Sequence, residues 1–210
     1  YCERASDAGL WAEPVNAITN LGFILAAYYC ARALVPLKTR SLREVGDIWL
    51  LVIALFAIGI GSGLWHTAPN QTTVLMDVIP ITLFINVYLL SAMRRLLGLS
   101  WAKTILCFAA YWALTIAAQT HLDPDTLNGT IMYAPTYITL AILSLAIAHK
   151  NKVLGEEFLF VLGLFTLSLI LRTVDTWVCP LMPLGTHFLW HAFNAIVLYR
   201  LLRVLIARVA

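Results

Sequence analysis

The chain has 210 residues, of which 61% are hydrophobic and only 12% are charged. Soluble globular domains carry about 25% charged residues, so this composition excludes an ordinary soluble domain and indicates an integral membrane protein. The net charge of +3 is small, and we expect no nucleic-acid partner. The distribution of charge along the chain is more informative than its total.

Seven segments are apolar and long enough to cross a membrane, which takes roughly 20 mostly apolar residues in a helix. In chain order they cover residues 14–34, 47–66, 74–93, 101–120, 130–148, 157–174 and 185–205. The connections between them are short, and no linker or low-complexity tract interrupts the chain. The sequence therefore predicts one domain over residues 1–210, an all-α integral membrane bundle of seven transmembrane helices.

Lysine and arginine indicate the orientation, because they are enriched in the cytoplasmic loops of membrane proteins. Twelve of the 14 lie in alternate connections or at the end of the chain, at Arg32, Lys38, Arg40, Arg43, Arg94, Arg95, Lys103, Lys150, Lys152, Arg200, Arg203 and Arg208. Only Arg4 and Arg172 lie elsewhere. The connections on that other side are acidic or neutral, with Asp123, Asp125 and Asp175 among them. We therefore expect the N-terminus outside the cytoplasm, on a periplasmic or lumenal side, and the C-terminus inside.

Five polar side chains lie in the outer halves of the predicted helices, where an ionisable group is costly and by default marks function. Ser62 and His66 end the second helix, in GSGLWH, and Asp77 opens the third. His187 and His191 open the last helix, and their four-residue spacing puts both imidazoles on one side of it. The predicted topology brings all five to the same membrane face at similar depth.

Three histidine ligands with one position left open for water are typical of catalytic zinc, whereas structural zinc usually has four protein ligands. Zinc lowers the pKa of its bound water to about 7, which supplies hydroxide at neutral pH. Asp77 is then a candidate acid and base that takes a proton from the water and returns it to a leaving group. Ser62 is a candidate donor to the oxyanion of a tetrahedral intermediate.

Other interpretations explain parts of this pattern. A haem in a membrane bundle needs only His66 and one histidine of the last helix, although it requires neither Asp77 nor Ser62. Histidines at a membrane interface also occur as packing or interfacial residues, and we interpret His121 and His149 in that way. The residues alone leave zinc and these alternatives open.

A second polar cluster surrounds the start of the first helix. Glu3, Asp7 and Glu13 precede it, and Asn16 and Asn20 lie four residues apart on it. Oxygen-rich ligands of this type suit a hard cation such as calcium. A solvated acidic segment followed by two asparagines that bond neighbouring helices would look the same.

The four cysteines divide by topology. Cys2 and Cys179 fall on the non-cytoplasmic side, where disulfides persist. Cys30 and Cys107 fall within helices and are expected to be reduced packing residues. The sequence therefore predicts a Cys2–Cys179 disulfide that ties the N-terminal segment to the connection before the last helix.

Taken together, these motifs resemble those of the alkaline ceramidases, seven-helix membrane amidases of the superfamily that includes the adiponectin receptors. The resemblance spans nearly the whole chain and is carried by YCER with WAEPVNAITN, GSGLWHTAPN with MDVIPI, DTWVCP and GTHFLWH. It implies a zinc ion bound by His66, His187 and His191. It further implies that Asp77 is the general acid and base and that Ser62 stabilises the oxyanion.

The resemblance also implies a disulfide matching Cys2–Cys179 and a calcium site fed by the N-terminal acidic segment. Its candidate ligands in this chain are Glu3, Asp7 and Glu13. Arg4 departs from the family, because that position is often acidic or neutral. A tyrosine on the fifth helix is implied near the oxyanion; Tyr133 and Tyr137 are the candidates, and Tyr133 lies nearer the active face.

The expected function is therefore a zinc-dependent intramembrane amidase, in which zinc-bound water attacks the carbonyl of ceramide to give a sphingoid base and a free fatty acid. The alternatives are a related zinc hydrolase of another lipid, such as a phospholipid or lipid-anchor esterase, and an adiponectin-receptor-like signalling protein. We expect a multi-pass protein of the bacterial inner membrane, or of the ER or Golgi membrane in a eukaryote. No obligatory protein partner is indicated.

Overall fold

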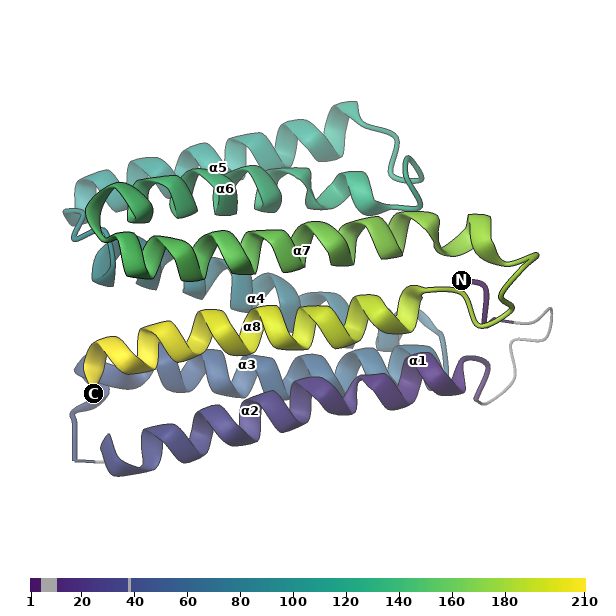
Figure 1. The fold of residues 1–210 in the computed structure, drawn as a ribbon, viewed down its shortest axis with the longest axis horizontal. Helices are drawn as coiled ribbons and strands as arrows, with labels where there is room; N and C mark the ends of the chain where they lie inside the picture. The colour runs from purple at the N-terminus through teal and green to yellow at the C-terminus, as the bar shows by residue number, and fades with distance from the viewer. Residues whose placement is uncertain (5–10, 38) are drawn as a thin grey trace.

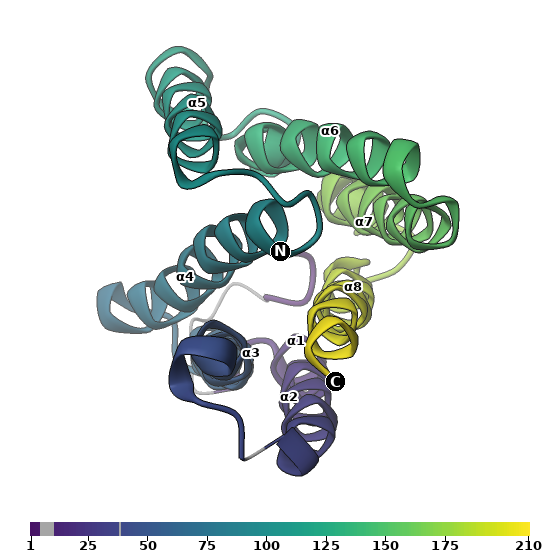
Figure 2. The same cartoon turned by 90° about the vertical axis from the view of Figure 1, so that its left-hand side faces the viewer.

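The structure, a computed structural model, describes residues 1–4, 11–37 and 39–210, and the regular secondary structure in these ranges is helical (Figure 1). The helices are α1 (Pro14–Thr19), α2 (Leu21–Leu34), α3 (Leu42–Thr67), α4 (Gln71–Arg95), α5 (Trp101–His121), α6 (Ala134–Lys150), α7 (Lys152–Val178) and α8 (His187–Val209), with the 3₁₀ turns η1 (Val35–Leu37) and η2 (Thr130–Tyr133). Viewed along the helices, α2, α3, α4, α7 and α8 surround the centre, α6 packs on α7, and α5 lies at the edge (Figure 2). The predicted all-α class is confirmed in the described ranges.

Most of these helices fit a membrane environment. Among the described residues, six helical segments are long and apolar enough to cross a membrane: Pro14–Leu37, Leu42–Thr67, Gln71–Arg95, Trp101–His121, Thr130–Lys150 and Lys152–Val178. Helix α8 is similar in length but carries His187, His191 and Asn194 in its first half. Outward side chains such as Leu106 and Ile142 are 71% and 63% exposed, as expected for surfaces that face lipid. The helices fit a multi-pass membrane protein, while the seventh span and the orientation stay predictions.

Two of the predicted segments differ from the observed helices, one by a break and one by its start. The first segment is broken, because the Asn20 side chain donates to the backbone oxygen of Asn16 at 2.7 Å and the Asn20 backbone N–H turns to Ala17 instead. The short helix α1 packs against α3 and α8, as α2 also does. The fifth segment begins with η2, and α6 starts only at Ala134, with Pro135 in the first turn, where its missing N–H costs no hydrogen bond.

Helices α3 and α4 approach each other closely at Gly61. A Cβ atom on Gly61 would lie 1.9 Å from the backbone oxygen of Met76, so no side chain fits at that position. Gly59 lies against the start of α2, where a Cβ would meet the Ile24 side chain at 2.7 Å and the backbone oxygen of Asn20 at 3.0 Å. The approach brings Ser62, the residue after Gly61, next to Asp77, the residue after Met76.

Gly61→Ala is expected to destabilise the protein, because the added methyl group must push α3 and α4 apart. Overpacking of this kind costs about 1–3 kcal/mol. Gly63→Ala is the matched control, since its Cβ would meet the nearest atoms at 3.8 Å, an ordinary contact. Thermal unfolding in detergent compares the two, and equal stability of both variants would contradict the close packing at Gly61.

Candidate active site and metal centre

Three buried histidines meet at one end of the bundle. His66 lies at the end of α3, and His187 and His191 lie on the first turns of α8. One ring nitrogen from each lies within 4.8 Å of the others, and in the described part of the chain this is the group of side chains that could hold a metal ion. The ring centroids are 4.6 to 5.2 Å apart. The prediction that the topology brings these three residues together is confirmed.

Two of the three rings are oriented by hydrogen bonds from Nδ1. His66 Nδ1 lies 2.6 Å from Glu13 Oε2, a carboxylate oxygen that can only accept from it when ionised. His191 Nδ1 lies 3.1 Å from Thr19 Oγ1, whose own proton is donated to backbone oxygens of α1. Both Nδ1 atoms therefore carry the proton, which leaves Nε2 as the available ligand atom. Partners of this kind are typical of metal-binding histidines, so the donor set fits a metal ion.

The start of α8 is held by Asp175, a buried residue of α7. Its Oδ1 accepts the backbone N–H groups of Thr186 at 2.7 Å and His187 at 2.9 Å, and its Oδ2 accepts that of Cys2 at 3.1 Å. Gly185 has a φ of +63°, and a Cβ there would lie 2.1 Å from Asp175 Oδ1. Sequence reasoning treated Asp175 only as an acidic residue of a connection. Its role could not be predicted, because the sequence does not show that the start of α8 lies beside this residue of α7.

Residues 1–4, which we call the N-terminal strap, cross this end of the bundle. The predicted disulfide between Cys2 and Cys179 is confirmed, with the two Cα atoms 5.2 Å apart. The Tyr1 ring stacks on His187 with the centroids 3.8 Å apart. The strap is therefore attached both to the end of α7 and to the start of α8.

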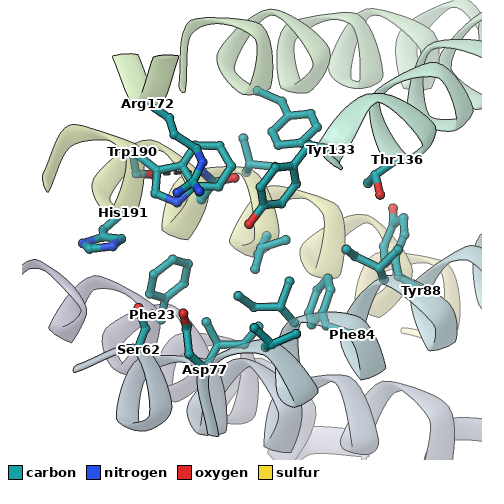
Figure 3. A pocket seen from close by; sticks show the side chains of 18 of the residues that line it. Phe23, Ser62, Asp77, Phe84, Tyr88, Tyr133, Thr136, Arg172, Trp190 and His191 are labelled. Atoms are coloured by element: carbon teal, nitrogen blue, oxygen red, sulfur yellow. Dashed lines mark hydrogen bonds between the residues drawn. The ribbon is translucent and has the colours of Figure 1, made fainter. Parts of the chain in front are cut away.

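A cavity of about 320 Å³ extends from the histidines into the bundle (Figure 3). Ser62 and Asp77 project into its polar end side by side from α3 and α4. Asp77 Oδ1 is buried and accepts no hydrogen bond from the described residues. Apolar side chains such as Phe84, Leu143 and Leu201 line the rest. The arrangement offers one carboxylate oxygen without a partner and a hydroxyl beside the histidines, at the head of a largely apolar space.

Tyr133 and Arg172 face Ser62 and Asp77 from the other side of the cavity (Figure 3). The Arg172 guanidinium lies over the rings of Tyr133 and Trp190, with Cζ 5.6 and 5.4 Å from their centroids. Sequence reasoning missed Arg172 as a site residue, although its place away from the other basic residues was a signal.

Of the two tyrosine candidates, Tyr133 lines the cavity, whereas Tyr137 packs elsewhere. The Tyr137 hydroxyl lies 3.1 Å from Thr166 Oγ1, and its ring packs on Phe165. Tyr133 is the last residue of η2, directly before α6, and lines the cavity. The geometry therefore favours Tyr133 over Tyr137 for any role in the site.

The family comparison supports an enzyme at this cavity. The family model described as Ceramidase matches residues 1–209. The chain belongs to the ceramidase family. Ceramidases are hydrolases that act on the amide bond of a membrane lipid, which agrees with apolar helices around a cavity that has one polar end. No curated protein matches the chain.

Glu3, one of the three candidate calcium ligands, instead accepts hydrogen bonds from the first turn of α1. Its two carboxylate oxygens accept the backbone N–H groups of Val15 at 2.6 Å and Asn16 at 2.8 Å. A carboxylate in this position is favoured by the partial positive charge of a helix N-terminus. Asp7, the second candidate, lies outside the described residues.

Glu13, the third candidate, is completely buried and also has both oxygens engaged. Oε1 accepts from Arg4 Nε at 2.5 Å, and Oε2 accepts from His66 and from Asn16 Nδ2 at 2.9 Å. Burial alone would raise the pKa of Glu13, but the hydrogen bonds from His66 and Asn16 and the charge of Arg4 hold it below its ordinary value. These contacts support no calcium site among the described residues and give Glu13 a role beside His66.

Glu13→Gln is expected to weaken metal binding by about 10–100-fold, the usual effect of removing an outer partner of a ligating histidine. Glutamine keeps the size of the side chain but loses the charge that fixes the Nδ1 proton of His66. Elemental analysis during titration with a chelator measures the change. The matched control is Glu157→Gln, which breaks an ion pair with Arg200 far from the histidines. Equal metal retention in the two variants would refute the role of Glu13.

Proposed function

We propose that this member of the ceramidase family is a zinc-dependent intramembrane amidase that hydrolyses ceramide to a sphingoid base and a free fatty acid. The observation that carries the proposal is that one cavity joins three buried histidines, Ser62 and Asp77 to an apolar lining. Family membership supports the amide bond and the lipid substrate.

The metal ligands in this proposal are His66, His187 and His191. Their three nitrogen atoms match the ligand set of catalytic zinc, which keeps a further position open. When bound, zinc polarises a carbonyl and lowers the pKa of a bound water. Glu13 and Thr19 hold the His66 and His191 rings in the tautomer that a metal ion requires.

Asp77, Ser62 and Tyr133 would carry out the proton transfers and stabilise charge. Asp77 Oδ1, which has no competing donor among the described residues, would accept a proton from the attacking water. It would then deliver that proton to the amide nitrogen as the sphingoid amine leaves. The hydroxyl groups of Ser62 and Tyr133 would donate to the carbonyl oxygen as it gains negative charge, and the Arg172 guanidinium adds a fixed positive charge at the same end of the cavity.

The apolar part of the cavity suits an acyl chain. It continues along α8 to Leu201, ten residues beyond His191, which corresponds to about 15 Å of helix. The polar end lies near the end of α3 and the start of α8, where hydrocarbon would give way to the interface in the proposed orientation. An amide at the boundary between headgroup and acyl chain would then reach the histidines without leaving the membrane.

Asp77→Asn is expected to lower fatty-acid release from ceramide by about 10²–10⁴-fold, because the amide cannot accept the proton of the attacking water. The assay uses purified protein in detergent and follows free fatty acid by mass spectrometry. Asp125→Asn, in an exposed connection, is the matched control and should leave the rate unchanged. Turnover in Asp77→Asn at the rate of the control would exclude Asp77 as the acid and base.

A further inference from the structure

Arg4 contacts two neighbours of His66, Glu13 and Trp65. Its Nε lies 2.5 Å from Glu13 Oε1, and Glu13 in turn accepts from His66 through Oε2. Its guanidinium also lies over the ring of Trp65, the residue before His66, with Cζ 5.2 Å from the centroid. The side chain is 27% exposed, whereas the Glu13 carboxylate that it binds is fully buried. Arg4 is thus the cation that neutralises the buried carboxylate behind His66.

This arrangement disagrees with the calcium ion that the family resemblance implies. Calcium takes six to eight oxygen ligands. All four carboxylate oxygens of Glu3 and Glu13 already accept hydrogen bonds from the chain. One of these donors is itself a cation, Arg4, at a position that is often acidic or neutral in the family. The described residues therefore do not fit calcium at this carboxylate.

We propose that Arg4 takes the place of a calcium ion in this chain. The guanidinium neutralises Glu13 and, by fixing Oε1, aims Oε2 of the same carboxylate at His66 Nδ1. Arginine suits this task because it stays charged at any physiological pH and its donors have a fixed direction. Arg4 is then a positioning residue that acts on the metal centre through Glu13, and the centre is independent of calcium.

Removal of Arg4 should weaken metal binding at the histidines. A buried carboxylate that loses its charged partner is strongly disfavoured, so Glu13 would turn toward other donors. His66 Nδ1 would then lose the acceptor that holds its ring, and the metal ion would bind more weakly. The disulfide of Cys2 and the contacts of Glu3 would still hold the strap in place.

The first test is calcium binding by the unaltered chain. Thermal unfolding and isothermal titration calorimetry are recorded with about 1 mM calcium, the range in which weak extracellular sites bind, and with a calcium-selective chelator. We expect no binding heat and no shift of the unfolding temperature. Stoichiometric binding, or destabilisation by the chelator, would overturn the proposal.

The second test compares zinc release to a chromogenic chelator in Arg4→Gln, Arg4→Lys, Glu13→Gln and the Arg4→Gln/Glu13→Gln double variant. We expect Arg4→Gln to weaken zinc retention by about 10–100-fold and Arg4→Lys, which keeps the charge but not the fixed direction of the donors, to restore part of it. In the Glu13→Gln background, Arg4→Gln should add little, because residues that act through one another are not additive. Additive losses in the double variant, or unchanged retention in Arg4→Gln, would contradict the proposal. Zinc release is measured without substrate, so the result does not depend on the proposed lipid.

Discussion

The hydrogen bond between Glu13 and His66 is the interaction on which the proposed metal centre depends. It joins a carboxylate at the start of α1 to a histidine at the end of α3, 53 residues later, over 2.6 Å. A charged group buried in an apolar bundle must be paired and hydrogen-bonded, or it is neutralised. Glu13 meets this condition through Arg4, Asn16 and His66 at once. The strap, α1 and the three histidines are therefore joined in one polar network at this end of the bundle.

The need to pair buried polar groups, together with close packing, explains other features near the histidines. Helix α8 begins beside the site with its first backbone N–H groups buried, and Asp175 supplies the acceptor that they need. Gly61 and Gly185 lie where a side chain would force α3 from α4, or the turn before α8 from Asp175. Asp77 Oδ1 has no partner among the described residues, and Asp77 lines the cavity, where this oxygen is available for chemistry.

Sequence reasoning could predict the parts of this structure that depend on apolar length and topology. Segment length located the helices, and the alternation of sides brought His66, His187 and His191 together and paired Cys2 with Cys179. It could not predict the break at Asn20, because a break is decided by one side-chain hydrogen bond inside an apolar run.

The role of Glu13 was also beyond the sequence. An acidic residue before a helix is equally consistent with a metal ligand, a solvated residue or a partner of histidine, and only its neighbours in space distinguish these. Arg172 and Asp175 were missed for a similar reason, since each acts across helices that are distant in sequence. Arg4 was noticed as a departure from the family, but its effect depends on the carboxylate that it contacts.

The central claim is that His66, His187 and His191 hold a zinc ion. The most direct measurement is elemental analysis of the purified protein combined with X-ray absorption spectroscopy at the zinc edge. The account predicts one zinc ion per chain with three histidine nitrogen ligands, and its loss in His191→Ala. Protein without stoichiometric zinc, or protein with the Soret band of a haem, would contradict it.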